Sequence, residues 1–130
     1  MECPECGADA VAFAVPDAYR ESLPGPEPGA ALCTRCLSLQ PVAEPPDAVP
    51  DLASTSDALP DDDAAAVPLA LLLGLLENLA LYRAEIDDLA TAVERAGVDP
   101  LLVLDRLAAD PAIDAATDLR GRRRQLEQLR

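Results

Sequence analysis

The sequence predicts an α+β protein, in which two to three short antiparallel strands precede a small bundle of about four short helices. Short apolar stretches alternate with turn-forming residues in the first third, and apolar residues recur at helical spacing in the second half. A chain of 130 residues has room for one or two small domains. We therefore divide it into a sheet module at residues 1–42, a linker at 43–63 and a helical domain at 64–130.

Three extended stretches are expected in the sheet module, each ending at a proline or at a cysteine pair. They cover residues 10–15, 30–32 and 37–40. The segment 16–29 contains four prolines and two glycines, and we expect a loop there. A sheet module of about 40 residues buries too little apolar area to fold alone, so it requires an additional stabilising element such as a bound metal ion.

The predicted linker, residues 43–63, is acidic and rich in proline. It contains four prolines, seven acidic residues and no basic residue, and its few apolar side chains follow no period. Such a segment buries too little to offset its chain entropy, so we expect disorder or an extended course.

The first predicted helix begins at Ala64 and carries leucines on nearly every face. Pro68 is expected in its first turn, where a proline is tolerated. A helix with so little polar surface must be surrounded. It is therefore the central helix of the bundle, the interface of a homodimer through residues 67–81, or both.

Three further helical segments follow, after a turn expected at residues 78–82. The first has apolar residues at i, i+3, i+4 and i+7 and a glycine stop, the second starts with an Asp-Pro cap, and the third is capped by an aspartate. The residues that define them are Ile86, Leu89, Ala90, Val93 and Gly97; Asp99, Pro100, Leu101, Leu104 and Leu107; and Asp118, Leu119, Leu126 and Leu129.

All four cysteines lie in two Cys-x-x-Cys pairs, Cys3-Pro4-Glu5-Cys6 and Cys33-Thr34-Arg35-Cys36. Two pairs at this spacing are the pattern of a four-thiolate Zn²⁺ site, closed and structural. The alternatives are an iron site, disfavoured because the second pair lacks the proline and glycine of the first, and redox dithiols or disulfides.

Two residues beside the cysteines are expected to support the metal. Gly7 can adopt the positive φ that turns its amide toward the sulfurs, and Arg35 can offset part of the negative charge of four thiolates. The second pair is followed by Leu37 instead of glycine, so we expect a less ideal turn there.

The charge balance is strongly acidic. Twenty-four Asp and Glu face ten basic residues, all arginine, which gives a net charge of −14 and no Lys or His. This composition is typical of a protein kept hydrated in high salt, and codon bias is the alternative explanation. The acidic start and the short apolar runs predict a cytoplasmic protein with no membrane partner.

The one basic cluster consists of Arg120, Arg122, Arg123 and Arg124. Such a cluster can contact nucleic-acid phosphates, but no aromatic residue lies near it to stack a base. We favour arginines that pair with nearby carboxylates at a helix end. The sequence has no His, no Lys, no nucleotide-binding motif and no catalytic-nucleophile motif. It therefore also predicts that the protein is not an enzyme.

Cys3-Pro4-Glu5-Cys6-Gly7 with Cys33-x-x-Cys36 resembles the small CPxCG-related zinc finger proteins of haloarchaea. The longer pattern, including residues 98–102 and 104–111, is similar to an uncharacterised haloarchaeal family with a domain of unknown function. The resemblance covers the sheet module and the helical half but not the linker, and it implies a zinc ribbon without an assigned activity.

These observations predict a zinc-binding scaffold that recognises a protein partner. One alternative is a nucleic-acid-associated zinc-ribbon factor linked to transcription or translation, which would use the arginine cluster. The other is a thiol redox or metal-buffering protein.

Overall fold

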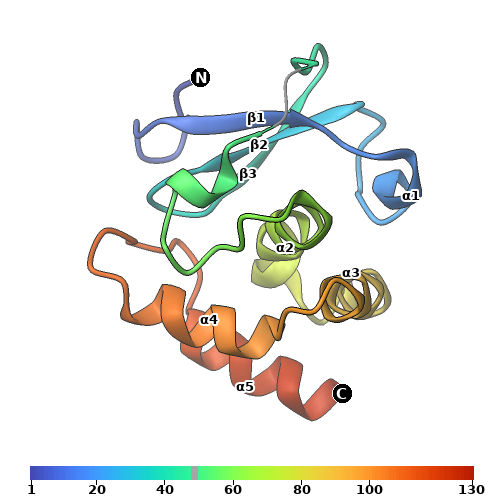
Figure 1. Cartoon of the computed structure of the whole chain (residues 1–130), viewed down its shortest axis with the longest axis vertical. Coiled ribbons are helices and arrows are strands. Elements are labelled where there is room, and N and C mark those ends of the chain that lie inside the picture. Colours follow the sequence, from blue (N-terminus) through green and yellow to red (C-terminus); the bar gives the residue numbers. More distant parts are fainter. Residues whose placement is uncertain (48–49) are drawn as a thin grey trace.

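The structure, a computed structural model, describes residues 1–47 and 50–130, and it confirms the α+β class. A three-stranded sheet forms one layer, α2 lies against it, and α3, α4 and α5 lie on the far side of α2 (Figure 1). The elements are β1 (Ala10–Ala14), α1 (Asp17–Arg20), β2 (Gly29–Cys33), β3 (Leu39–Val42), the 3₁₀ turn η1 (Leu52–Ser54), α2 (Asp63–Leu75), the 3₁₀ turn η2 (Leu76–Asn78), α3 (Arg83–Arg95), α4 (Pro100–Ala109) and α5 (Leu119–Leu129).

The sheet is antiparallel, with β2 between β1 and β3. All five residues of β2 are buried, as expected for a central strand with a neighbour on each side. The predicted third strand ended before Pro41, whereas β3 continues through Pro41 to Val42. A proline is tolerated there because β3 is an edge strand. The predicted loop at 16–29 also contains a short helix, α1.

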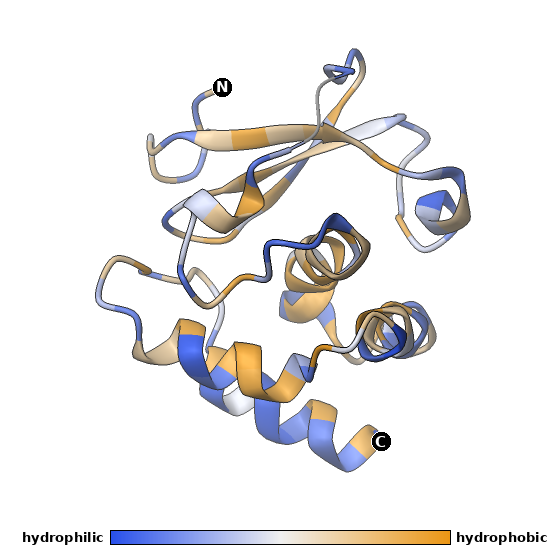
Figure 2. Cartoon of the chain, viewed as in Figure 1, coloured by the Kyte–Doolittle hydropathy of each residue, from blue (hydrophilic) through white to orange (hydrophobic). Residues whose placement is uncertain are grey.

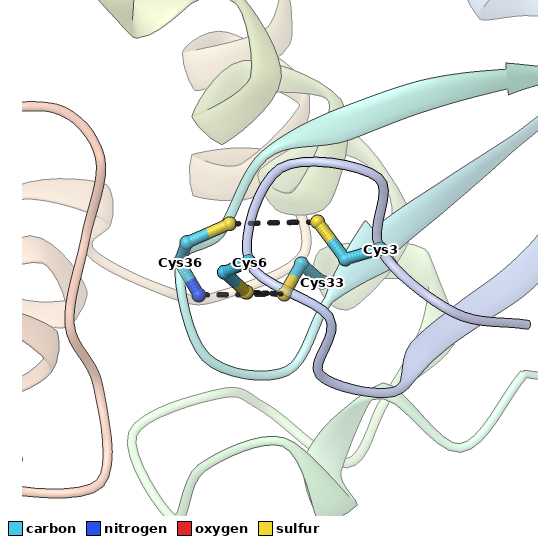
Figure 3. A group of neighbouring side chains, drawn as sticks. All are labelled: Cys3, Cys6, Cys33 and Cys36. Atoms are coloured by element: carbon cyan, nitrogen blue, oxygen red, sulfur yellow. Dashed lines mark hydrogen bonds between the residues drawn. The ribbon is translucent and has the colours of Figure 1, made fainter.

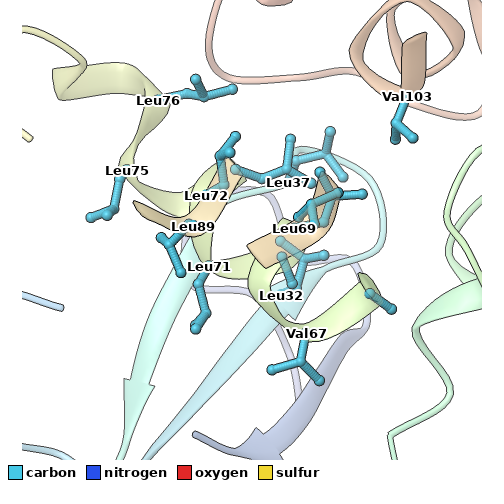
Figure 4. Close-up of a cluster of buried hydrophobic side chains, with 14 of the residues drawn as sticks. Leu32, Leu37, Val67, Leu69, Leu71, Leu72, Leu75, Leu76, Leu89 and Val103 are labelled. Carbon is cyan, nitrogen blue, oxygen red and sulfur yellow. The ribbon is translucent and has the colours of Figure 1, made fainter. Parts of the chain in front are cut away.

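The leucine-rich helix α2 is the centre of the core. It contributes ten buried residues, and one apolar cluster joins it to the sheet and to α3, α4 and α5 (Figure 4). After its acidic start, the α2 ribbon is coloured mainly as hydrophobic, whereas the α5 ribbon is mostly hydrophilic (Figure 2). The leucines from Leu69 to Leu79 are all buried within one chain. The helix is thus the central one of the bundle. Within the predicted interface at residues 67–81, the exposed leucine is Leu81, whose exposed fraction is 73%.

The start of α2 differs from the prediction. Asp62 caps the helix by accepting a hydrogen bond from the N–H of Ala64 at 3.0 Å, so Pro68 lies inside the helix and not in its first turn. Near the other end, Gly74 lets α2 approach β3, because a Cβ atom on Gly74 would lie 2.5 Å from the Cβ of Leu39.

The remaining helices follow the prediction, and the caps of α4 and α5 are the expected aspartates. Asp99 accepts from the N–H of Leu101 at 2.9 Å, and Asp118 accepts from the N–H of Gly121 at 3.1 Å. Gly97 ends α3 with a φ of +89°. The expected turn at residues 78–82 is present between η2 and α3.

The predicted linker is not wholly extended or free of the core. Leu52 and Leu59 are 1% and 4% exposed and belong to the main apolar cluster, and Asp51 caps η1. These two leucines anchor the segment, because each buries its side chain between elements distant in the sequence. Residues 48 and 49 of the predicted linker lie outside the described residues, and the division into domains at 42/43 and 63/64 stays a prediction.

Across the described ranges, the helices are all too short or too polar to cross a membrane.

Candidate metal centre

The fold brings all four cysteines together at one end of the sheet. Cys3 and Cys6 lie in the loop before β1, Cys33 ends β2, and Cys36 lies in the turn before β3 (Figure 3). Their Sγ atoms all lie within 4.8 Å of one another. The Sγ atoms of Cys3 and Cys36 are 3.7 Å apart, and those of Cys6 and Cys33 are 3.4 Å apart.

These distances suit a four-thiolate metal ion. A tetrahedral ion with metal–sulfur bonds of about 2.3 Å separates its sulfurs by about 3.8 Å. The cluster is therefore close to that size, and small adjustments would complete the tetrahedron. Cys3, Cys33 and Cys36 are buried, and Cys6 is exposed, so the centre lies at the surface with one ligand facing solvent.

The first cysteine turn is closed by the backbone. The N–H of Gly7 donates to the carbonyl of Cys3 at 2.9 Å, and the N–H of Cys3 donates to the carbonyl of Ala8 at 2.8 Å. Gly7 has the expected positive φ, +80°, but its amide thereby serves the turn and not a sulfur. A residue with a Cβ atom would be strained at this φ, which explains glycine here.

The second turn supplies the donors to sulfur. The backbone N–H groups of Arg35 and Cys36 both point at the Sγ of Cys33, at 3.4 Å. The side chain of Arg35 is exposed and forms no ion pair within the described chain, so its observed contribution comes from its backbone. Hydrogen bonds of this kind disperse thiolate charge.

Leu37 occupies the position equivalent to Gly7 and adopts the same left-handed backbone, with φ +62°. For a residue with a branched side chain this conformation costs about 1–2 kcal/mol. The side chain of Leu37 is 4% exposed and packs in the main core. Its burial, at about 1.5–3 kcal/mol, offsets the strain.

Burial is the main influence on the pKa of the Cys33 thiol. It raises the pKa of Cys33 to about 12, although the N–H groups of Cys36 and Arg35 oppose the shift. Without a cation the Cys33 thiol is thus neutral at pH 7. Binding of a metal ion would displace its proton, because thiolate is the ligand form.

The two cysteine turns are also bound to each other and to a distant loop. Thr34 donates from its N–H and from its Oγ1 to the carbonyl of Asp9, both at 2.9 Å. On the other side, the loop between α4 and α5 donates to the second turn: Asp114 N–H to the Arg35 carbonyl at 2.8 Å, and Ala116 N–H to the Cys36 carbonyl at 3.0 Å. No sequence pattern marks these contacts, because all but the bond from the Thr34 hydroxyl are made between backbone groups.

The sequence matches the model of a protein family of unknown function, DUF6276, over residues 2–130. The chain belongs to DUF6276. The match includes the segment 43–63, which the expected resemblance did not cover. No curated protein and no solved structure matches this DUF6276 member.

The arginine cluster of this DUF6276 chain lies on α5, away from the cysteines in sequence and engaged with neighbouring groups. Arg122 donates to the backbone carbonyl of Glu77 at 3.0 Å and to Gln125 at 2.8 Å. Arg123 pairs with Asp105, at 3.1 Å, and with Glu127. Arg120 and Arg124 are exposed.

Proposed function

We propose that this protein is a zinc-binding scaffold whose four-cysteine centre is structural. The proximity of the four Sγ atoms, within 4.8 Å, carries the proposal. Cys3, Cys6, Cys33 and Cys36 would occupy all four positions of a tetrahedral zinc ion. A closed site of this kind contributes folding energy and leaves no position for a substrate.

A non-catalytic role agrees with the composition. The sequence contains no His or Lys, which removes the commonest general bases and Schiff-base nucleophiles. The centre also sits where the sheet meets the α4–α5 loop, so that the metal would stabilise tertiary structure. We therefore propose that the ordered surface, and not the metal, is what a protein partner recognises.

The geometry also supports metal binding over dithiol redox chemistry. The two sulfur pairs within hydrogen-bond contact join Cys3 with Cys36 and Cys6 with Cys33, across the motifs. A redox Cys-x-x-Cys unit would pair within one motif. Zinc is preferred to iron because the second turn has Leu37 where an iron site of the rubredoxin type would have glycine.

Origin and location belong to the same proposal. We propose that the protein is cytoplasmic and that its cysteine pattern forms a CPxCG-type zinc ribbon. We also propose that it is halophilic, because 24 acidic residues face ten arginines and no lysine. Nucleic acid is a less favoured partner, since Arg122 and Arg123 are held by neighbouring side chains and backbone.

Metal analysis of the purified protein tests the central claim. We expect one zinc per chain in the wild type and loss of zinc in Cys33→Ser, with Ser22→Ala, which changes a hydroxyl outside the centre, as the matched control. Iron, or four cysteines oxidised to disulfides in freshly purified protein, would contradict the proposal.

Affinity capture in high salt tests the scaffold role. We expect a protein partner to be recovered with the wild type and Ser22→Ala, and lost with Cys33→Ser. Recovery with the wild type and both variants would separate partner binding from the metal centre.

A further inference from the structure

A cavity of about 320 Å³ lies next to the metal centre, between the second cysteine turn and the α4–α5 loop. This volume is at the lower end of the range of about 300–1,000 Å³ for small-molecule sites. Cys36 itself lines the cavity, so that one wall is shared with the proposed metal centre.

Polar side chains from separate segments converge on this cavity. They are Glu5 from the first cysteine turn, Ser38 and Gln40 from the second turn and β3, Glu77 from η2 and Thr117 from the α4–α5 loop. Ser38, Gln40 and Thr117 are half-buried, whereas Glu5 and Glu77 are exposed and form the rim. Convergent polar groups of this kind orient a ligand.

The walls of the cavity are tied together by hydrogen bonds. Ala116, which precedes Thr117, donates its N–H to the carbonyl of Cys36 at 3.0 Å. The side chain of Cys36 makes a second contact, in which its Sγ lies 3.2 Å from the Oγ of Ser38. The cavity is therefore built between elements that are bonded to one another, and it does not depend on one mobile side chain.

The charge in the cavity is negative. Glu5 and Glu77 line it, and no arginine does. Neither carboxylate forms an ion pair in the part of the chain that the structure describes. The bond from Arg122 to Glu77 goes to the backbone carbonyl, at 3.0 Å, and this leaves the Glu77 carboxylate available to a ligand.

Three buried leucines also line the cavity, beside Gly74 of α2. We refer to Leu37, Leu73 and Leu119 together as the leucine floor. A ligand that fills the cavity would thus present a short apolar stem to the leucines and a polar head to the rim.

We propose that this cavity binds a small organic cation, with an ammonium or guanidinium head and a short alkyl stem. The head pairs with the carboxylates of Glu5 and Glu77, and its N–H groups reach the oxygens of Ser38, Gln40 and Thr117. A zinc ion held by four thiolates adds two negative charges at the Cys36 wall. That addition rests on the proposed function, whereas the two carboxylates and the leucine floor do not.

Titration of the metal-loaded protein with n-butylammonium, followed by the backbone amide NMR shifts of Ser38, Gln40 and Thr117, tests the proposal. About 1 M NaCl removes long-range attraction and leaves contact pairs. We expect saturable shifts, and weaker binding of butan-1-ol, which has the same stem without the charge. Glu77→Gln should weaken butylammonium binding about twofold to fivefold.

Glu21→Gln is the matched control, because Glu21 is exposed and lines a different groove, between α1 and α3. It should leave the affinity unchanged, and Glu5→Gln gives a second rim variant if Glu77→Gln does not fold. Non-saturable shifts, equal affinity for butan-1-ol, or equal effects of Glu77→Gln and Glu21→Gln would overturn the proposal. Zinc content, measured on the same sample, reports separately on the metal centre.

Discussion

The backbone N–H of Ala116 donates to the carbonyl oxygen of Cys36 at 3.0 Å, which binds the α4–α5 loop to a cysteine turn. Two residues earlier, Asp114 makes the same kind of bond to Arg35 at 2.8 Å. Both acceptors lie in the turn whose N–H groups point at the Sγ of Cys33. The order of this turn and the order of the loop are therefore coupled.

Removal of the proposed metal ion by a chelator should loosen the α4–α5 loop. Without a cation the second cysteine turn loses its anchor, so the amides of Asp114 and Ala116 should exchange hydrogen at least about tenfold faster, as expected for local opening. Hydrogen exchange followed by NMR measures this. The amide of Ile86, bonded to Tyr82 at 2.8 Å within the α3 region, serves as the internal reference. Equal acceleration at Ile86 would mean global unfolding, and no acceleration at Ala116 would refute the coupling.

At position 37, glycine should give a more stable protein than alanine, which is the reverse of the usual order of stability. Leu37→Ala loses apolar burial and keeps the left-handed strain, whereas Leu37→Gly loses the burial and relieves the strain. We expect Leu37→Gly to be about 1 kcal/mol more stable than Leu37→Ala, although both are less stable than the wild type. Urea unfolding measures the difference.

The matched pair for this test lies in a helix. Leu72 is buried in α2, where alanine is favoured over glycine by about 1 kcal/mol, so Leu72→Ala should be more stable than Leu72→Gly. If both sites rank the two substitutions alike, strain at Leu37 is not significant.

Gly74→Ala should destabilise the protein, although the same change stabilises most helices. The new Cβ would lie 2.5 Å from the Cβ of Leu39, so α2 or β3 must move, at a cost of about 1–3 kcal/mol. Thermal unfolding measures the loss. Leu39→Gly, which removes the Cβ atom in the contact, combined with Gly74→Ala should be less destabilised than the sum of the two single changes, and simple additivity would exclude the contact as the cause.

The contact between Ser56 and Asp110 should make stability depend on pH. The Ser56 hydroxyl, which donates at 2.5 Å, and the N–H of Ala112 hold the pKa of Asp110 below its usual value. A lowered pKa means that the folded state binds fewer protons. The resulting stability is present above the unfolded pKa, about 3.9, and is lost as pH falls through the folded value.

Ser56→Ala should therefore lower the free energy of unfolding at pH 7, and this difference from the wild type should shrink as the pH falls below about 3.9. Denaturant unfolding followed by circular dichroism, in dilute protein, measures it. Ser54→Ala is the control, because the Ser54 hydroxyl donates to the backbone carbonyl of Asp51 and not to a carboxylate. A difference independent of pH would assign the effect to packing.

Signals within a few residues of each other were enough to predict most of the elements. Asp99 followed by Pro100 marks the start of α4 without any knowledge of the rest of the chain, because an N-cap bond spans only two or three residues. The spacing of Ile86, Leu89 and Val93 likewise predicts the buried face of α3. The cysteine spacing predicted which four thiols would meet, since two tight turns can converge on one ion.

The tertiary structure decided how those elements are joined. Leu52 and Leu59 lie in a stretch with no period, so their burial depends on packing in the main apolar cluster, which includes residues distant in the sequence. Pro68 is accommodated inside α2, and the leucines that suggested a dimer are covered by the same chain. By itself, the sequence determined the α+β elements, their caps and the four clustered thiols, because local geometry encodes them. Only packing between remote residues decided that the Leu37 side chain would be buried in the main core and that Ala116 would bond to Cys36.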